Sequence, residues 1–431
     1  MISSIKNIFQ VQDFKYRLYN TFWFILIFRV GAFVALPGVD SSSLKPYKDG
    51  ILGMLDTFLG NAFSNASIFG LGIIPYISAS IAVQLLTIIF PKFQRIQMEG
   101  FSGRKKLNRL TKFLTLIIAT FQSVPYVYSL INKGVVFVNP IYFAISSIFF
   151  LVSGTLFCVW LGDRITDKGI GNGSSILITI GIVSSIPNAI YSEYLSVGKS
   201  HGFLIMGLEF LVLYFLIMFI IAFTQATRRI PIIFANQFDK SVSFTGAQKY
   251  ISFKLNNTGI MPVIFAQTLM FIPSFILASF ANKSDIVLSM SKWFMDVTSW
   301  QYSFIFSILI ILFTFFYTAI TVNPDTLAAD MKRQNSFIPG VSSGKETSKY
   351  LDDILSKLTL PSAIILAVIA ILPIFAKTLG VSPSFSRFFG GSSVIILVGV
   401  MLDIIQQIQN FSILSKYGSI GSKSDIKKIK K

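Results

Sequence analysis

The sequence predicts an all-α membrane protein that crosses a bilayer ten times, and three observations indicate this fold class. Of the 431 residues, 53% are hydrophobic and only 13% are charged, which leaves too little polar surface to coat a water-soluble globule of this size. The mean hydropathy is +0.68. The apolar residues also occur in long uninterrupted blocks, and about 20 such residues cross a hydrocarbon layer of roughly 30 Å. A membrane must therefore supply much of the solvent for this chain.

Ten apolar blocks along the chain are long enough to be membrane spans. The segment before them, residues 1–20, is polar and mildly basic and has no short apolar core followed by a small-residue cleavage site, so we expect no cleavable signal peptide. The predicted spans are Thr21 to Pro37, Ile73 to Phe90, Phe113 to Ile131, Ile141 to Leu161, Gly173 to Ile190, Phe203 to Phe223, Gly259 to Ala281, Tyr302 to Asn323, Leu360 to Ala376 and Gly391 to Gln409.

The distribution of basic residues predicts the orientation of the spans, because Lys and Arg resist translocation and remain on the cytoplasmic side. With the N-terminus inside, the cytoplasmic segments hold 28 of the 37 basic residues and the opposite side holds eight. We therefore expect both termini in the cytoplasm. The cytoplasmic parts include residues 1–20, the loops 224–258 and 324–359, and a basic tail at 410–431.

The ten predicted spans divide into two sets of five, and the sixth begins on the opposite side from the first. This arrangement permits two inverted halves, residues 21–190 and 203–409, joined by an external hinge loop at 191–202, with a pathway between them. No convincing sequence repeat accompanies this symmetry, which follows from topology alone. The stretch from Asp56 to Gly72, rich in Gly, Ser and Asn, is apolar but too short to span. It predicts a re-entrant segment or, alternatively, an external loop with a short interfacial helix.

Few side chains in the sequence offer enzyme chemistry. A single cysteine, Cys158, and a single histidine, His201, exclude an internal disulfide and most metal or acid–base sites. The ionisable residues within the predicted spans are Arg29, Glu209 and Asp403, and a structural role for each is about as common as a functional one. The sequence contains no nucleophile elbow, zinc-protease motif or P-loop. We therefore expect no catalytic activity, no cofactor and no metal, and an energy-coupling ATPase must be another protein.

Two other function classes remain open at this point. A secondary transporter with the same inverted plan would place acidic groups at mid-membrane, for which Asp403 alone is thin support, and an intramembrane hydrolase is a more distant alternative. The second predicted span gives a different indication, because Ile77 and Ile81 lie four residues apart on one helix face beside small Ser and Ala residues. Such a face is more often a helix-packing surface than the wall of a pore.

The segment from Asn65 to Leu86, NASIFGLGIIPYISASIAVQLL, closely resembles the bacterial SecY family, the central subunit of the Sec protein translocase. Further matches follow the family's order through nearly the whole chain. They are Arg29 to Gly31, Pro37 to Asp40, Glu99 to Lys105, Gly169 to Gly173, Arg228 to Pro231, Pro262 to Ala266, Asn323 with Pro324, and Gly390 to Ser392. On these motifs the chain is identified as a member of that family.

The resemblance implies a channel of the cytoplasmic (inner) membrane that passes unfolded secretory polypeptides and releases transmembrane helices sideways into lipid. The two halves would hinge around a central hourglass pore, and the 56–72 segment would be the plug of its outer funnel. The implied plug residues are Asn61, Ala62, Phe63, Ser64, Asn65, Ala66, Ser67, Ile68 and Phe69.

The resemblance also implies a ring of side chains at the narrowest part of the pore. Stiff β-branched side chains would make a dewetting constriction that widens around a passing chain. Ser174 stands where family members usually have an aliphatic residue, which makes this ring slightly more polar or leaves that position in doubt. The implied ring is Ile77, Ile81, Ser174, Ile178, Ile264 and Ile396.

A lateral gate is implied between the second and third spans on one side and the seventh and eighth on the other. Gln84, Gln122 and Gln267 lie on these helices. Amides that bond across the gate would add a closing energy on the order of 1 kcal/mol per hydrogen bond. Ordinary interhelical hydrogen bonding explains these residues equally well.

The partners that the resemblance implies are the SecE and SecG subunits, the SecA motor ATPase, the ribosome, nascent chains and anionic lipids. Basic residues of the two cytoplasmic loops could meet ribosomal RNA phosphates, lipid headgroups or an acidic motor face, although membrane topology alone accounts for any one of them. Most bacterial members have Arg-Pro-Gly in the second loop, whereas this chain has Ser342 at the arginine position. Our hypothesis is that Lys345 compensates in part for the missing guanidinium. The basic residues are Arg228, Arg229, Lys249, Lys254, Lys332, Arg333 and Lys345.

Overall fold

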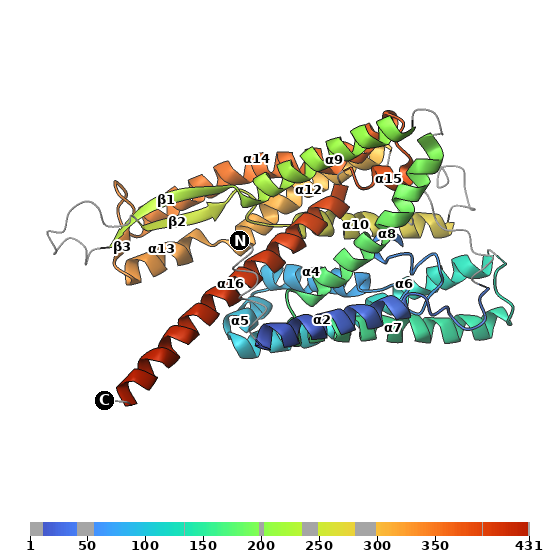
Figure 1. Cartoon of the computed structure of the whole chain (residues 1–431), viewed down its shortest axis with the longest axis horizontal. Coiled ribbons are helices and arrows are strands. Elements are labelled where there is room, and N and C mark those ends of the chain that lie inside the picture. Colours follow the sequence, from blue (N-terminus) through green and yellow to red (C-terminus); the bar gives the residue numbers. More distant parts are fainter. Residues whose placement is uncertain are drawn as a thin grey trace.

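The structure, a computed structural model, is built from long helices that lie side by side (Figure 1). It describes residues 12–40, 56–132, 134–197, 202–234, 249–280, 299–389 and 391–429, without the side chains of 12, 197, 202–203, 271–280 and 412–429. The helices of the first half are α2 (Gln12–Gly31), α4 (Ile74–Ile89), α5 (Pro91–Met98), α6 (Phe101–Asn132), α7 (Pro140–Lys168) and α8 (Gly173–Val197). Those of the second half are α9 (Gly202–Gln225), α10 (Met261–Phe280), α12 (Trp300–Thr321), α13 (Pro324–Arg333), α14 (Lys345–Thr378), α15 (Pro383–Ser386) and α16 (Gly391–Ile429).

Each of the ten predicted spans coincides with a helix. Among the described residues, seven helices are long and apolar enough to cross a membrane, or up to eight if the bent pair α4 and α5 is one span. The chain is therefore a multi-pass α-helical protein, while the count of ten spans remains a prediction.

Proline and capping residues set the ends of several helices. Phe90 is extended (φ −110°, ψ 117°) because a residue that precedes a proline is disfavoured in the α conformation, and α5 then leaves α4 at an angle of 103°. The Asn139 side chain accepts a hydrogen bond from the N–H of Ile141 at 3.1 Å, with Pro140 as the first helical residue of α7. An Asn cap followed by proline is a favourable helix start, because proline lacks the N–H that would be unsatisfied there.

The first helix ends earlier than predicted, at Gly31 rather than Pro37. The backbone beyond it pairs instead with the 56–72 segment. The N–H of Ile68 donates to the Val34 carbonyl at 2.9 Å, and the N–H of Leu36 donates to the Ala66 carbonyl at 2.8 Å. These tertiary hydrogen bonds replace the helical ones, so an apolar stretch leaves the helix.

The fifth helix ends later than predicted, because α8 continues from Ile190 to Val197. Residues 191–197 of the predicted hinge loop are therefore helical, and residues 198–201 lie outside the described part of the chain.

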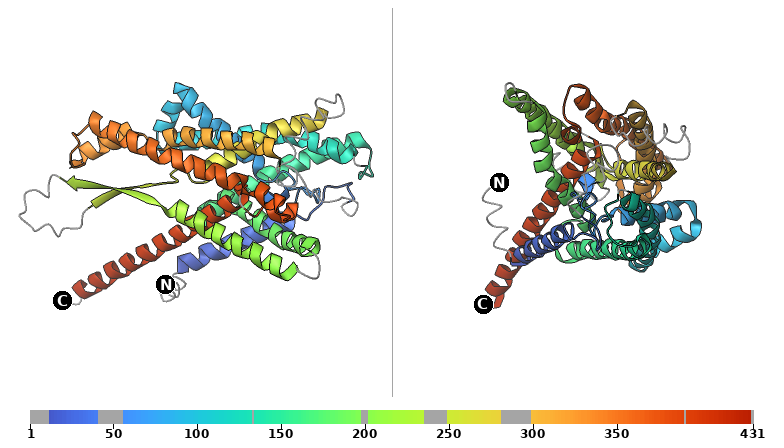
Figure 2. Two further views of the ribbon diagram at one scale, coloured as in Figure 1. Left: turned by 90° about the horizontal axis from the view of Figure 1, so that it is seen from above. Right: turned by 90° about the vertical axis from the view of Figure 1, so that its right-hand side faces the viewer.

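Buried side chains form one core in each half and a third core between them. Figure 1 shows α2, α4, α6 and α7 in a lower group and α9, α12 and α14 in an upper group, and the right-hand view of Figure 2 also separates the two groups. The core around Tyr126 belongs to the first half, and the core around Phe306 belongs to the second, with Ile74 at its edge. The shared core joins Leu161 and Ile182 of the first half to Phe385 and Ile396 of the second. The space between the halves is thus packed by α8, α15 and α16.

A small antiparallel sheet corrects the all-α prediction. Strand β1 (Thr227–Phe234) pairs with β2 (Lys249–Lys254) and with β3 (Ser336–Phe337), and Figure 1 shows the sheet beside α13, beyond the end of the helical layers. Side chains from the sheet, from α13 and from the start of α14 share one core, which includes Ile230, Phe253, Met331, Ile338, Leu351 and Leu355. The described parts of the two loops predicted to be cytoplasmic therefore form one folded unit, which we call the cytoplasmic platform after its predicted side of the membrane.

Candidate functional site

The 56–72 segment lies inside the helical layers rather than on the surface. Every residue from Asp56 to Gly72 is buried except Asn61, Asn65 and Ile68, which are half-buried. The carboxylate of Asp56 closes the segment on itself, since it accepts hydrogen bonds from the Ser64 N–H at 2.8 Å and the Ser64 hydroxyl at 2.5 Å. Seventeen residues of mostly turn structure are thereby packed as a compact unit. The alternative of an external loop does not match this burial.

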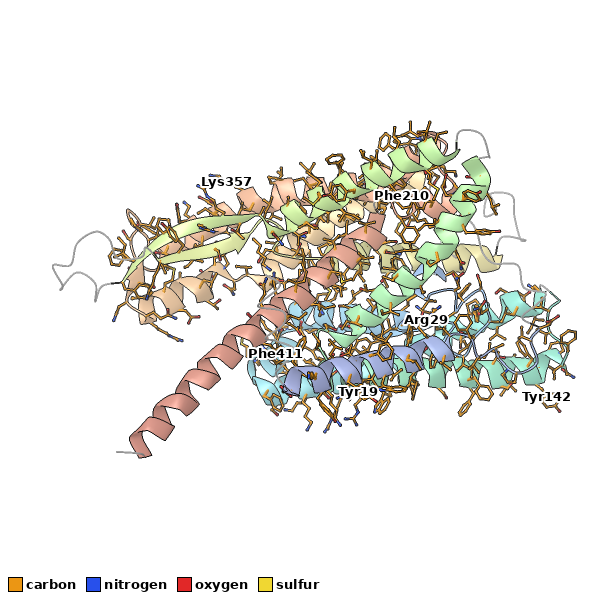
Figure 3. All side chains as sticks on the ribbon, viewed as in Figure 1. Tyr19, Arg29, Tyr142, Phe210, Lys357 and Phe411 are labelled. Carbon is orange, nitrogen blue, oxygen red and sulfur yellow. The ribbon has the colours of Figure 1, made fainter. Side chains whose placement is uncertain are left out.

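Polar side chains of the first half hold this segment by its backbone carbonyls. Arg29, labelled in Figure 3, donates from Nη1 to the Gly60 carbonyl at 2.9 Å. The Tyr126 hydroxyl donates to the Phe63 carbonyl at 2.8 Å, and Ser185 donates to the Thr57 carbonyl at 3.1 Å. A buried carbonyl without a partner would destabilise the fold by about 1–3 kcal/mol. These three side chains therefore supply hydrogen-bond donors to carbonyls for which the turn-rich backbone supplies no donor of its own.

Two glycines of the neighbouring helices allow the segment to approach closely. A Cβ atom on Gly154 of α7 would lie 2.2 Å from the Ile68 carbonyl oxygen, and one on Gly181 of α8 would lie 1.8 Å from that of Phe58. Both distances are far below van der Waals contact, and the atoms met are backbone. Glycine is therefore required at both positions in this packing.

Four of the six predicted ring residues surround one small apolar cavity between the halves. Ile77 of α4, Ile178 of α8, Ile264 of α10 and Ile396 of α16 all line it, and Phe58 of the 56–72 segment also contributes to its wall. The room for the centres of water molecules in the cavity is about 40 Å³. Six of the eight lining residues are apolar, and the other two are Gln267 and Thr268. A space of this kind holds few waters and no hydrated ion.

The other two predicted ring residues lie outside this cavity lining. Ile81 is one turn further along α4 from Ile77 and is 9% exposed. Ser174 is half-buried in the first turn of α8, where its hydroxyl donates to Asn172 Oδ1 at 2.7 Å. Phe58 lies within the predicted plug segment 56–72, but it was not among the plug residues 61–69 or the ring residues that the resemblance implied.

The three predicted gate glutamines make no hydrogen bond to one another among the interactions of the described residues. Gln84 donates to Ser80 at 3.4 Å within its own helix. Gln122 has a buried Oε1 with no partner, and Gln267 lines the cavity. Helices α4 and α10 do contact each other. A bond across the gate remains a prediction for these residues.

Three long-range hydrogen bonds that the sequence did not predict join the halves near the two ends of α8. At one end, the Glu193 carboxylate accepts from the Ser382 N–H at 2.9 Å and also from the Ser382 hydroxyl. At the other end, the Gly171 N–H donates to Gln407 Oε1 at 2.7 Å. Glu193 is fully buried, so its charge needs such donors. The only signal in the sequence was an acidic residue at the end of an apolar span.

The seven predicted basic loop residues are all exposed on the cytoplasmic platform. Arg228 and Arg229 lie on β1, Lys249 and Lys254 on β2, and Lys332 and Arg333 at the end of α13. Lys345 is the first residue of α14, and Ser342 precedes it, with its carbonyl bonded by the Thr347 hydroxyl at 2.8 Å. The structure thus brings basic residues from two distant loops onto one folded unit.

The described residues offer little for the alternative functions. They contain no group of three or more His, Cys, Asp or Glu side chains that could hold a metal ion. Asp403 is exposed on α16, and Cys158 is fully buried. Glu209 is 7% exposed with an unpartnered Oε2, while His201 lies outside the described residues.

Comparisons with known proteins agree with this arrangement. The model of the SecY family matches residues 67–405. The protein translocase subunit SecY of Aquifex aeolicus is 36% identical, covering 97% of this chain and 99% of that protein. The SecY subunit of Buchnera aphidicola is 35% identical, covering 96% of this chain and 96% of that protein. That of Escherichia coli K12 is 34% identical, covering 96% of this chain and 95% of that protein.

Solved structures show the same fold at low sequence identity. A structure described as a protein conducting channel has a TM-score of 0.66 and 16% identity, with 93% of each chain covered. Sec61 in the canine ribosome-channel complex has a TM-score of 0.59 and 16% identity, also with 93% of each chain covered. The family match over most of the chain and the full-length relatives confirm the resemblance found in the motifs, and the chain therefore belongs to the SecY family.

Proposed function

We propose that the chain is the channel-forming subunit of a protein translocase, which moves unfolded secretory polypeptides across the membrane and releases transmembrane helices sideways into lipid. The polypeptide passes between the halves 21–190 and 203–409, through a ring formed by the six predicted residues. The 56–72 segment is the plug that seals the resting channel. The channel itself performs no catalysis and depends on another protein for energy.

The observation that carries this proposal is the cavity between the halves. Four isoleucines from four different helices surround it, two from each half, and Phe58 of the proposed plug closes its wall. A constriction built in this way widens when the halves separate, because each side chain moves with its own helix. An apolar ring also resists ions while it is narrow. Helices α4 and α10, which meet at this cavity, are the proposed exit into lipid.

The proposed partners follow from the family and from the platform. Sec61, a structural neighbour, is part of a ribosome-channel complex, and the exposed basic residues of the platform can neutralise phosphates of ribosomal RNA or of anionic lipid. We also assign SecE, SecG and the SecA motor as partners. The chain would lie in the cytoplasmic (inner) membrane with both termini inside, which the 28 basic residues of the cytoplasmic segments support.

A photo-crosslinking residue at Ile81 tests the proposed path. The chain, assembled with SecE and SecG, is probed with a stalled secretory nascent chain, and we expect crosslinks at Ile81 because it lies one turn from the cavity-lining Ile77. The matched control is Ile145 of α7, which is 67% exposed on the outside of the helical layers. Crosslinking at Ile145 but not at Ile81 in an intact complex would exclude this pore.

Substitution of Lys345 tests the proposed motor contact. Lys345→Ala is expected to slow SecA-driven translocation about threefold, since the loss of one exposed charge contact removes roughly 0.5–1 kcal/mol, and Lys345→Arg should retain or improve the rate. Lys357→Ala, further along α14, is the control for the loss of a cytoplasmic lysine. Translocation rates in membrane vesicles measure the effect, and equal rates for wild type and Lys345→Ala would remove Lys345 from the contact.

A further inference from the structure

The loop after α15 brings a guanidinium from the second half to the beginning of the plug. Nη1 of Arg387 donates to the Thr57 hydroxyl oxygen at 3.2 Å. These residues are 330 positions apart in the sequence, and nothing in the sequence predicts their contact. Thr57 is 6% exposed and Arg387 is half-buried. The contact is therefore part of the packed interior rather than a surface encounter.

Thr57 is held from both halves at once. Its carbonyl accepts the hydrogen bond from Ser185 of α8, and its hydroxyl accepts the one from Arg387. The other side chains that bond the plug backbone, Arg29 and Tyr126, also belong to the first half. When the halves separate, the bond to Arg387 must lengthen, whereas the bonds to the first half need not change.

The charge of Arg387 also acts on Asp56, the residue that closes the plug on itself. Burial raises the pKa of the Asp56 carboxyl, whereas its hydrogen bonds from Ser64 and the positive charge of Arg387 lower it. Arg387 therefore favours the ionised carboxylate, which is the form that accepts both Ser64 hydrogen bonds. The guanidinium thus acts on two consecutive residues, one through a hydrogen bond and one through its charge.

The backbone around Arg387 is fixed by its neighbours. Phe385, Phe388 and Phe389 are buried in the shared core that also contains Phe58 and Phe69 of the plug. The N–H of Phe388 donates to the Phe385 carbonyl at 2.9 Å, and the rings of Phe385 and Phe389 meet edge to face at 5.3 Å. Because the turn is already anchored, the bond from the guanidinium requires ordering of the Arg387 side chain but no further ordering of the backbone.

We infer that Arg387 is a latch of the closed channel, which ties the second half to the plug through Thr57 and the charge of Asp56 and releases it when the halves separate. This inference depends on the proposed plug. The latch adds a polar, breakable contact to the apolar side chains that the plug and the second half bury in one shared core. It positions the plug and takes no part in contacting the translocating polypeptide.

The test measures ion conductance of proteoliposomes that contain the assembled complex without substrate. Arg387→Gln is expected to raise the resting conductance about threefold to tenfold, because it removes a charge-assisted hydrogen bond from the closed state. Thr57→Val should raise it by a smaller factor. The double variant should leak no more than Arg387→Gln alone, since both changes remove the same bond. Arg387→Lys, which keeps the charge, should recover part of the seal, and Arg164→Gln at the cytoplasmic end of α7 should not leak.

The outcomes separate the latch from the plug. If a complex that lacks residues 61–69 leaks and Arg387→Gln does not, the inference about Arg387 is wrong, whereas the plug assignment is retained. If neither leaks, the plug assignment is wrong, and the inference about Arg387, which depends on it, is wrong as well. Multiplicative leaks from Arg387→Gln and Thr57→Val would show that the two residues act separately and would also overturn the latch. Should Arg387→Gln fail to assemble, Thr57→Val and Arg387→Lys decide the question, because both nearly preserve side-chain volume.

Discussion

Deletion of residues 61–69 is expected to raise the resting ion conductance of the reconstituted channel by about tenfold or more. The deleted stretch includes Ala62, Phe63 and Ala66, all of which are at most 3% exposed. Burial of such side chains stabilises the closed state by several kcal/mol, whereas a tenfold change in an equilibrium requires only about 1.4 kcal/mol. Loss of the plug should therefore outweigh any single polar contact in the seal. The leak caused by the deletion is measured as the ion conductance of proteoliposomes, normalised to the amount of assembled complex.

A matched control separates the missing side chains from the shortened chain. Replacement of residues 61–69 by nine Gly and Ser residues keeps the length but removes the Phe63 ring that packs on Tyr126 at 4.4 Å. We expect this variant to leak nearly as much as the deletion. Tight vesicles from both variants would contradict the plug assignment.

The second large effect is expected from Gly181→Val on α8, which should raise the resting ion conductance because it disturbs the contact between α8 and the proposed plug. The Cβ atom alone would lie 1.8 Å from the Phe58 carbonyl oxygen, so either the first turn of the plug or α8 must move. Overpacking of this kind destabilises a packed state by about 1–3 kcal/mol, which corresponds to a leak increase of roughly fivefold to a hundredfold. Resting conductance and the thermal stability of the purified complex are the two measurements.

The control for Gly181→Val is Gly207→Val on α9, where an added Cβ would meet no atom within 4 Å. Both variants lose a helical glycine within a predicted span, so a difference between them reports the contact with the plug. In the background that lacks residues 61–69, where the seal is already lost, Gly181→Val should cause little further leak. An additional leak of the original size there would mean that the substitution opens the channel by a route other than displacement of the plug.

The membrane fold could be predicted from the sequence because apolar blocks of such length rarely form anything other than membrane-spanning helices. The exact ends of helices could not, as α2 illustrates. Residues Val34 and Leu36 are apolar, and their backbones leave the helix because Ile68 and Ala66 offer hydrogen bonds from a distant segment. The platform sheet was missed for a similar reason, since β1 and β3 pair across about a hundred residues of chain and β3 has only two residues.

The candidate site was predictable to the extent that it follows the family motifs. Ile77, Ile178, Ile264 and Ile396 were assigned by resemblance, and they meet at one cavity. The contacts of Glu193 with Ser382 and of Arg387 with Thr57 were not predicted. Each is a single polar residue at the end of an apolar stretch, and no periodicity or spacing in the sequence identifies a partner that far away.

The backbone pairing between residues 34–36 and 66–68 has a consequence for how the channel fills. The N–H groups of Leu36 and Ile68 and the carbonyls of Ala66 and Val34 satisfy one another in the resting state. Hydrocarbon offers no replacement partners for such groups, and each one left bare would be costly. In the proposed channel, water would therefore have to reach these groups as the proposed plug departs, so that hydration of this region would accompany unsealing and precede the arrival of any polypeptide there.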